Sequence, residues 1–410
     1  MHLTEQRNDY KEEKMKRYGK YFALFSLIYF IQGINGITSM PIFFYLKNDL
    51  GLSVQEMAYL GSVIGVAWII KPLWAIIVDS VSIYHSNKKS YIIIGYIVIM
   101  SMMFYVALTG LTLNKYIAVS MIVSLALAFC DVSGDGWMIV VGQKNDICDK
   151  LQTFQWSAVS VASIIVGLVG GYLAKNYSYN VAYFIVGLFV MLAVIYVAFI
   201  NKTEENYNKK AFNRKCMGGL REGFRNKQLW LSATFLLFLW FSPSFGIALN
   251  FKMVDVMGIT KIQLGVIQSV GACGAIVGGI IFYIICKRIS LKKLLYLSVL
   301  VSGATTFCFL YYPNIYIALL YAVIFGISGT ICHLVVLTYC AKITPKNAES
   351  FFFSGLCSIL NLGAMLSGLA GGYLYPIVGL DLLIIISGVF TLMCIVFIPF
   401  LKINGGLKNG

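Results

Sequence analysis

The chain has 410 residues, of which 59% are hydrophobic and 12% charged, whereas soluble domains contain roughly 45–50% apolar and 25% charged residues. These proportions exclude an ordinary soluble protein and indicate a membrane protein with many spans, long enough for two helical bundles. The formal net charge of +15 would suggest nucleic-acid binding in a soluble chain, so its distribution along the sequence decides its meaning.

Apolar runs of about 20 residues, the length that a spanning helix needs, recur along the whole chain. The first run is too long for the core of a secretory signal peptide, and the acidic residues before it are unlike a transit peptide, so we expect it to stay as the first helix. Counting the runs predicts twelve transmembrane helices, at about residues 21–46, 57–80, 91–113, 116–142, 154–173, 181–200, 229–250, 262–286, 291–312, 315–341, 351–373 and 379–401.

The positive charge is distributed unevenly between the two sides of the predicted membrane. If the N-terminus is cytoplasmic, 26 of the 32 lysines and arginines lie on the cytoplasmic side, five lie outside, and one, Lys71, lies within a span. Cytoplasmic loops of membrane proteins collect Lys and Arg. We therefore expect both termini in the cytoplasm, and we attribute the charge to topology rather than to nucleic-acid binding.

The chain divides and repeats near its middle. The longest polar stretch, 201–228, follows the sixth span, which predicts a cytoplasmic linker between domains 1–200 and 229–410. The heptapeptide GLVGGYL at 167–173 recurs as GLAGGYL at 368–374. Such glycine spacing can merely mark close helix packing. Together with twelve spans and a central loop it favours duplication, and it predicts an all-α protein of two pseudo-symmetric six-helix bundles, the major facilitator fold.

Two spans carry charged residues near their middle. Lys71 lies in the second span, and Asp131 and Asp135 lie one helical turn apart in the fourth. A charge near the membrane centre costs about 2.5–3.5 kcal/mol on insertion scales, so we expect these side chains to face the bundle interior. Lys71 and Asp135 lie at similar depth and can pair. Two interpretations stay open: a structural ion pair, or a site that binds substrate and takes up a proton.

Other polar residues in or near the spans are weaker candidates. Asp79 at the end of the second span, with Lys88 and Lys89 across the loop, matches a gating motif of the major facilitator fold, although the two lysines can also be simple topology signals. A polar face on a membrane helix either holds helices together or lines a cavity. The residues to which this choice applies are Gln32, Asn35 and Ser39 on one face of the first span, together with Asn250, Asn361, Gln152, Gln155 and Trp156. His333 can titrate during transport or be a hydrogen-bonded core residue.

The Ser242 to Gly246 stretch, which contains Pro243, predicts a kink in the seventh span.

Several stretches together resemble one family. Residues 71–96 read KPLWAIIVDSVSIYHSNKKSYIIIGY, and the sequence around residues 29–33, 131–143 and 341–363 adds further motifs. On these residues the chain resembles the folate-biopterin transporter family of the major facilitator superfamily. The resemblance implies a secondary active transporter of folates or pterins that works by alternating access, and we expect a monomer in the cell membrane. The buried acids predict proton coupling. A carboxylate would accept the 2-amino and ring N–H donors of a pterin in bidentate fashion, and Lys71 would attract an anionic group.

Other functions remain as alternatives. The nearest is a major facilitator permease for another amphipathic anion or a nucleoside-like metabolite, since a fold does not fix a substrate. A membrane enzyme is disfavoured because the sequence has no HExxH, no GxSxG and no phosphate-binding loop. A channel fits repeated halves less well. The ten cysteines show no CxxC spacing and lie mostly in apolar runs, so we expect neither disulfides, metal sites nor a cofactor.

Overall fold

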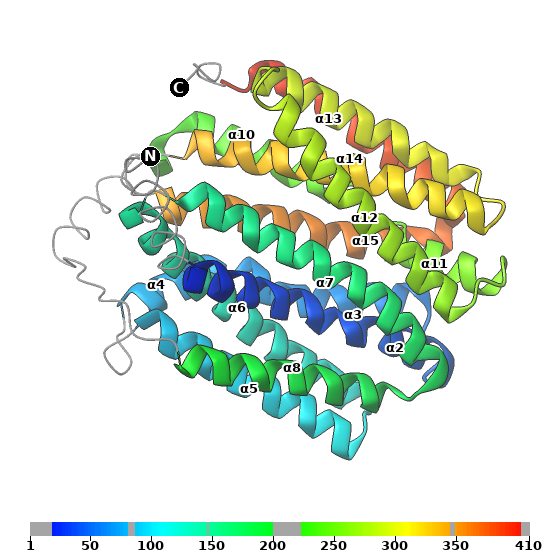
Figure 1. The fold of residues 1–410 in the computed structure, drawn as a ribbon. Helices are drawn as coiled ribbons and strands as arrows, with labels where there is room; N and C mark the ends of the chain where they lie inside the picture. The colour runs from blue at the N-terminus through cyan, green and yellow to red at the C-terminus, as the bar shows by residue number, and fades with distance from the viewer. Residues whose placement is uncertain (1–18, 81–86, 146, 200–222, 345–348, 403–410) are drawn as a thin grey trace, which may run out of the picture.

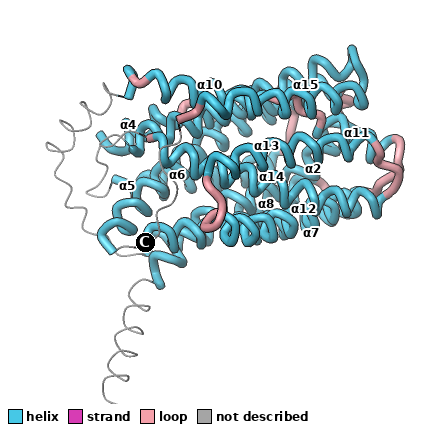
Figure 2. The backbone as a smooth tube through the Cα atoms, turned by 90° about the horizontal axis from the view of Figure 1, so that it is seen from above, coloured by secondary structure: helices cyan, strands magenta, loops and turns pink. Residues whose placement is uncertain are grey.

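The computed structural model describes residues 19–80, 87–145, 147–199, 223–344 and 349–402. Within these ranges nearly every residue is helical and no strand is present, which confirms the all-α prediction. The helices run side by side along one long axis (Figure 1). Seen from above, almost the whole described chain is helix (Figure 2). We call the end of the bundle that holds residues 19 and 402 the terminal end, and the opposite end the far end (Figure 1).

The first six predicted spans are all present. The first consists of residues 19–34, the 3-10 turn η1, the short helix α2 and the π-helical turn η2, and the second is divided into α3 and α4. The bounds are η1 Asn35–Thr38, α2 Ser39–Phe44, η2 Tyr45–Asp49, α3 Val54–Ile69, α4 Lys71–Ser80, α5 Asn87–Thr109, α6 Leu113–Asn145, α7 Cys148–Asn176 and α8 Tyr179–Phe199.

The other six spans follow from residue 227 onward. Their bounds are α10 Lys227–Phe241, α11 Gly246–Asp255, α12 Lys261–Ile285, α13 Leu291–Thr306, η3 Phe307–Leu310, α14 Ile315–Ile343, α15 Glu349–Met393 and η4 Cys394–Phe400. The apolar stretch Phe351–Phe400 has 50 residues, too many for one crossing. It is interrupted at Gly379, whose φ of 74° suits glycine, and therefore holds the last two spans. The fold is the predicted twelve-helix arrangement.

Buried apolar side chains form one cluster within residues 21–197 and another within 229–401. A third cluster joins Met40, Phe44 and Ala174 to Phe245 and Leu249, so the first and second parts of the chain share a core at the far end. The division into domains 1–200 and 229–410 stays a prediction. Most of the predicted linker, through residue 222, lies outside the described residues.

Two spans are interrupted next to a proline. The seventh breaks between Phe241 and Gly246, around Pro243, so the predicted kink is confirmed as a complete break. The second breaks at Ile70, a feature that the sequence analysis missed. Pro72 has no N–H to donate to the carbonyl oxygen of Trp68, four residues earlier. The Asn361 side chain donates to that oxygen instead, at 3.1 Å.

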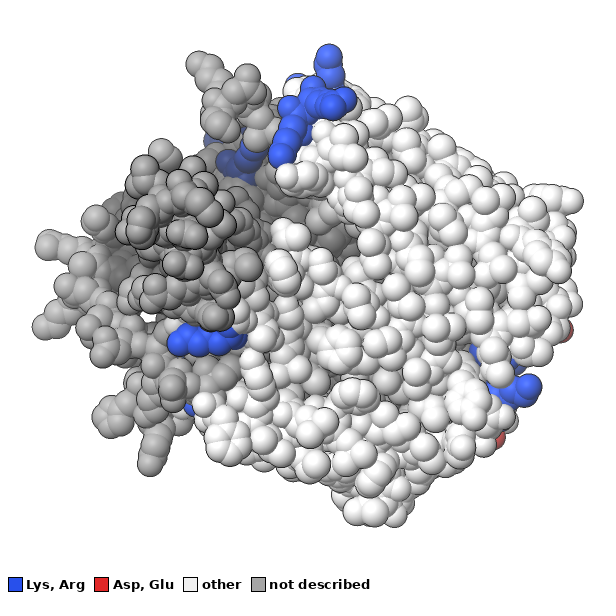
Figure 3. All heavy atoms as spheres, viewed as in Figure 1, with Lys and Arg blue, Asp and Glu red and all other residues white. Residues whose placement is uncertain are grey.

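The outer surface of the bundle is apolar between its ends. Figure 3 shows Lys and Arg at both ends of one face and a broad band without charged side chains between them. Large apolar side chains lie exposed on the helices, including Leu108, Leu192, Tyr283 and Leu300. Every described span has the length and hydropathy of a membrane-crossing helix, so this band is the surface that faces lipid.

Candidate functional site

The central feature is a buried ion pair between the second and fourth spans. Lys71 Nζ lies 2.6 Å from Asp131 Oδ2, and the side chains of Lys71 and Asp131 are 15% and 7% exposed. The break at Ile70 places Lys71 at the start of α4, and its ammonium group lies 4.5 Å from the ring centroid of Trp68. An opposite charge and an aromatic face thus both compensate the burial of this cation.

Asp135 has a different partner from the one expected. It lies one turn after Asp131 on α6, and its Oδ1 accepts a hydrogen bond of 2.6 Å from the Tyr29 hydroxyl. The expectation that Lys71 pairs with Asp135 is therefore wrong, because the ammonium group bonds to Asp131. The similar depth of Lys71 and Asp135 did not distinguish between two carboxylates only one turn apart. Asp135 is thus held by a neutral hydroxyl and lies close to a second carboxylate.

These groups lie deep between the ends of the bundle. At 1.5 Å per residue, Lys71, Asp135 and Tyr29 are each about 13–15 Å along their helices from the terminal end. A membrane hydrocarbon core is about 30 Å thick. The charged cluster of Lys71, Asp131 and Asp135, with Tyr29, therefore lies near the membrane midplane, where ionisable residues are rare and functional by default.

The second half of the chain also contributes to this site through α15. The Asn361 amide bonds to the carbonyl oxygen of Trp68, directly before the break. One turn earlier on α15, Cys357 lies within electrostatic range of Lys71, Asp131 and Asp135. The charged cluster therefore lies where α4 and α6 of the first half face α15 of the second.

Aromatic rings extend from the charged cluster across both halves. The Tyr29 ring lies 6.2 Å from the Trp156 ring on α7, measured between centroids. Trp156 lies 5.5 Å from His333 on α14, and His333 lies 5.7 Å from Trp240 on α10. Of these rings, Trp156 keeps 36% of its surface exposed. Trp156 was among the weaker polar candidates of the sequence, whereas Trp240 was not predicted.

The predicted amides have different surroundings. The Gln32 side-chain oxygen and the Gln155 side-chain nitrogen are buried without a hydrogen-bond partner among the described residues. Gln155 is only 1% exposed. Within the same described part of the chain, no hydrogen bond joins the side chain of Asn35 or Asn250 to the charged cluster. Of the predicted amide residues, Asn361 therefore contacts the site through a hydrogen bond, Gln32 offers a free acceptor and Gln155 offers a free donor.

The predicted gating lysines hold helices of the first half together. Lys88 Nζ donates to the carbonyl oxygen of Gly136 on α6 at 2.8 Å, and Lys89 Nζ donates to that of Ala198 on α8 at 2.9 Å. A Cβ at Gly136 would lie 3.2 Å from Lys88 Cε, so this glycine makes room for the lysine. Asp79 belongs to α4, but its side chain lies outside the described part. Gating by these three residues stays a prediction.

The far end of the bundle is closed by polar contacts between the halves, which the sequence analysis did not anticipate. Lys47 at the end of the first span forms an ion pair of 2.6 Å with Asp255 at the end of α11. Lys261 at the start of α12 donates to the carbonyl oxygen of Ala174 on α7 at 3.0 Å. The available signal was weak: opposite charges at the outer ends of the first and seventh spans.

The repeated glycine motif closes the same end by direct helix contact. A Cβ at Gly171 on α7 would lie 2.9 Å from the carbonyl oxygen of Lys261, and one at Gly265 on α12 would overlap the carbonyl oxygen of Gly167. The corresponding glycine of the second copy, Gly372 on α15, would meet Ala58 on α3 at 2.5 Å. Both copies of the motif thus pack one half closely against the other.

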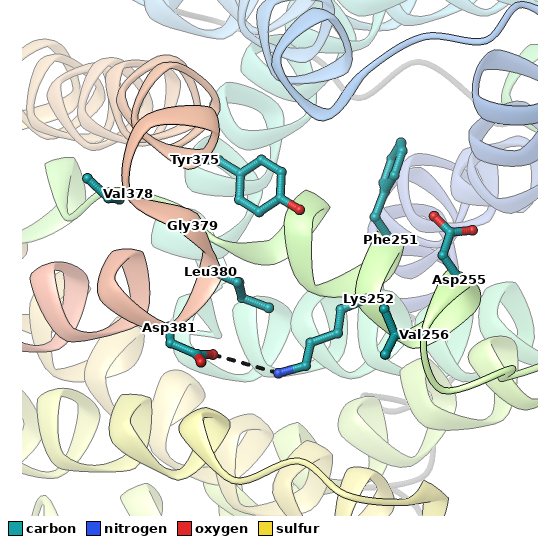
Figure 4. Close-up of a pocket in the computed structure, with 9 residues that line it drawn as sticks. All are labelled: Phe251, Lys252, Asp255, Val256, Tyr375, Val378, Gly379, Leu380 and Asp381. Atoms are coloured by element: carbon teal, nitrogen blue, oxygen red, sulfur yellow. Dashed lines mark ion pairs between the residues drawn. The ribbon is translucent and has the colours of Figure 1, made fainter.

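An open pocket of about 430 Å³ lies at the far end, away from the charged cluster. Figure 4 shows its lining from α11 and from the turn around Gly379, with Tyr375 and Phe251 on opposite sides. Lys252 and Asp381 approach to 3.7 Å across it. Each charged group of the lining has an ion-pair partner, since Lys252 pairs with Asp381 and Asp255 pairs with Lys47, and Asp381 is largely exposed. Among the described residues, no group of His, Cys, Asp or Glu is arranged to hold a metal ion.

Comparison with known proteins identifies similarity over most of the chain. A family profile described as the BT1 family matches residues 32–403. The folate-biopterin transporter of Synechocystis sp. is 24% identical over 404 residues, covering 91% of this chain and 80% of its own. Folate transporter 1 of Plasmodium falciparum is 23% identical over 361 residues, covering 83% and 70%. The crystal structure of a D-xylose-proton symporter superposes with a TM-score of 0.76 at 10% identity, covering 92% of this chain and 96% of that one, and shows the major facilitator fold.

Proposed function

The chain belongs to the BT1 family, and from this premise we propose that it is a secondary carrier that moves folates or pterins across a membrane by alternating access. It is a multi-pass transporter rather than an enzyme, in agreement with the names of its relatives. The folate or pterin substrate is the proposal, drawn from those names and from the chemistry of the buried site.

The charged cluster near the membrane midplane is the observation that carries this proposal. Lys71 is neutralised by Asp131, whereas Asp135 is held by the Tyr29 hydroxyl. Asp135 is therefore the carboxylate available to a ligand. It can accept the paired N–H donors of a pterin, or take up a proton when the site is empty. The ion pair of Lys71 and Asp131 holds α4 and α6 in position around the site, and the lysine supplies positive potential for an anionic substrate.

The arrangement of the two ends supports alternating access. The glycine contacts and the Lys47–Asp255 ion pair close the far end. With both termini in the cytoplasm of the cell, as the Lys and Arg distribution predicts, the closed far end is the outer end, and this conformation separates the site from the outside. Opening to the outside requires those far-end contacts to separate while the terminal end closes.

Thermal unfolding of the purified protein with candidate ligands tests the substrate class. A ligand that binds the native state raises apparent stability by mass action. We expect folic acid, 5-formyl-tetrahydrofolate or biopterin to stabilise the protein, and we expect Asp135→Asn to abolish that stabilisation. Asp381→Asn, at an exposed carboxylate of the far pocket, is the matched control and should behave as the wild type does.

Two results would count against the proposal. If only an unrelated anion or a nucleoside stabilises the protein, the protein is still a carrier, but its substrate is not a folate or pterin. If a pterin stabilises the wild type and Asp135→Asn equally, the substrate class holds, but Asp135 does not bind the substrate. Proton coupling is tested by uptake into vesicles, where collapse of an imposed pH gradient should reduce accumulation.

A further inference from the structure

Three aromatic residues meet beside the charged cluster, and they come from both halves of the chain. Trp156 lies on α7 of the first half, and His333 and Trp240 lie on α14 and α10 of the second. We propose that these three side chains form the part of the substrate site that holds the flat face of a bicyclic heteroaromatic ring, with Trp156 as its platform. This inference rests on the proposed function and names the residues that recognise the ring.

The depth of the three rings agrees with this role. Counted along their helices from the terminal end, Trp156, His333 and Trp240 lie about 12–20 Å deep, overlapping the depth of Asp135 and Tyr29. The Tyr29 side chain connects the two groups, because its hydroxyl bonds to Asp135 while its ring contacts Trp156. A planar ligand whose polar edge reaches Asp135 therefore has its ring at the level of Trp156.

The indole of Trp156 has surface available for stacking. It is 36% exposed, although it lies beside buried groups. Its two ring neighbours, His333 and Tyr29, meet it at interplanar angles of 66° and 63°, so neither lies flat against it. Flat heteroaromatic rings stack on aromatic side chains whatever their substituents, because each has a π-face.

Two buried amide groups without partners in the described part of the chain belong to the same two helices as Trp156 and Tyr29. Gln155 directly precedes Trp156 and is 1% exposed, and its side-chain nitrogen has no acceptor among the described residues. Gln32 follows Tyr29 by three residues on the same helix face, and its buried side-chain oxygen likewise lacks a donor there. Buried polar groups are normally hydrogen-bonded. A ring that carries both a carbonyl oxygen and N–H donors offers the missing partner to each amide.

Ligand binding to three variants of the purified protein tests the platform. The variants are Trp156→Leu, which removes the ring, Trp156→Phe, which keeps a smaller one, and Trp230→Leu, which removes an exposed tryptophan near the start of α10. Dissociation constants are measured for biopterin, folic acid and 4-aminobenzoyl-glutamate, the part of folic acid without the pterin ring. Each variant is first checked for monodispersity and for an unchanged thermal midpoint without ligand.

We expect Trp156→Leu to weaken biopterin and folic acid binding about tenfold or more, as loss of a stacking partner does. Trp156→Phe should stay within about threefold of wild type, and Trp230→Leu should be unchanged. Any binding of 4-aminobenzoyl-glutamate should not respond to Trp156→Leu. If Trp156→Leu binds pterins normally, Trp156 is not the platform, and the proposed pterin carrier is unaffected by that result. Failure of the wild type to bind any pterin would overturn the proposed function and the platform together.

Discussion

At the level of single residues, sequence reasoning found the charges but not their partners. Lys71, Asp131 and Asp135 are conspicuous because ionisable groups are costly inside a membrane, and the structure brings all three together. Tyr29 was not predicted, because it lies 106 residues from Asp135 and tyrosine is common in this chain. Trp156 was a weaker candidate, and its ring partners were not predicted for the same reason, since they lie on distant helices.

The two aspartates have different partners, and substitution tests whether their roles differ as well. Asp131→Asn leaves the buried Lys71 ammonium group without its counter-ion, so we expect a loss of about 3–5 kcal/mol in unfolding free energy. Asp135→Asn removes a carboxylate held by a neutral hydroxyl and should fold with much smaller loss while abolishing proton-driven uptake. Thermal unfolding and vesicle uptake measure the two effects.

A control for the ion pair removes both charges at once. The double variant Lys71→Met, Asp131→Leu leaves no unpaired buried charge, so it should recover most of the stability that Asp131→Asn loses. If Asp131→Asn unfolds at the wild-type temperature, Lys71 is not dependent on Asp131, and the assignment of Asp131 to a positioning role is wrong.

At the level of elements, the positions of the spans follow from hydropathy, and their interruptions depend on tertiary contacts. The break around Pro243 was predicted because proline and glycine occur together there. The break at Ile70 was not, although Pro72 is equally visible in the sequence, because helices can also continue past a proline with only a kink. The partner that compensates this break, Asn361, lies 293 residues away from Trp68.

Asn361 and Pro72 should therefore be energetically coupled. Asn361→Ala leaves the buried carbonyl oxygen of Trp68 without a donor, which we expect to cost about 1–3 kcal/mol. In a Pro72→Ala background the backbone N–H of residue 72 becomes available, so the same substitution should cost less. A double-mutant cycle of unfolding free energies measures the difference. Equal costs in both backgrounds would show that the Asn361 bond does not replace the missing backbone bond.

The glycine contact between α7 and α12 allows a test of far-end closure. Gly265→Ala forces α12 away from the Gly167 carbonyl oxygen and should favour the conformation with the far end open. In a version of the protein whose only cysteine is Cys357, an impermeant thiol reagent outside the cell should then label that cysteine several times faster. Gly279→Ala is the control, because Gly279 lies on the same helix and a Cβ added there would meet no neighbouring atom within 4 Å. Unchanged labelling by Gly265→Ala would show that this contact does not limit opening.

At the level of the whole molecule, the twelve-helix architecture was predictable in full, because span number, the central polar stretch and the repeated glycine motif are all local sequence features. The closed far end was not predictable, since it depends on which of two conformations the chain adopts. The same two copies of the motif serve both purposes: they indicate duplication, and they pack the halves together.

Orientation is a further prediction at this scale. Cysteines introduced singly at Ser178, in an exposed far-end turn, and at Ser290, between the eighth and ninth spans, should differ in labelling by an impermeant maleimide. With cytoplasmic termini, intact cells should label the cysteine of Ser178→Cys, and Ser290→Cys should react only after permeabilisation. The reverse pattern would place the termini outside the cell and the closed far end in the cytoplasm.

The charged cluster belongs entirely to the first half of the chain. Its net charge has an electrical consequence. Lys71 and Asp131 cancel, so the empty site carries one negative charge when Asp135 is ionised and none when it is protonated. A charge that crosses a potential of 100 mV changes in energy by about 2.3 kcal/mol. If Asp135 takes up a proton, as proposed, the resting potential of a cell acts on the charge of the empty site only in its deprotonated form. The current that accompanies each turnover should then report the protonation of Asp135 as well as the charge of the cargo.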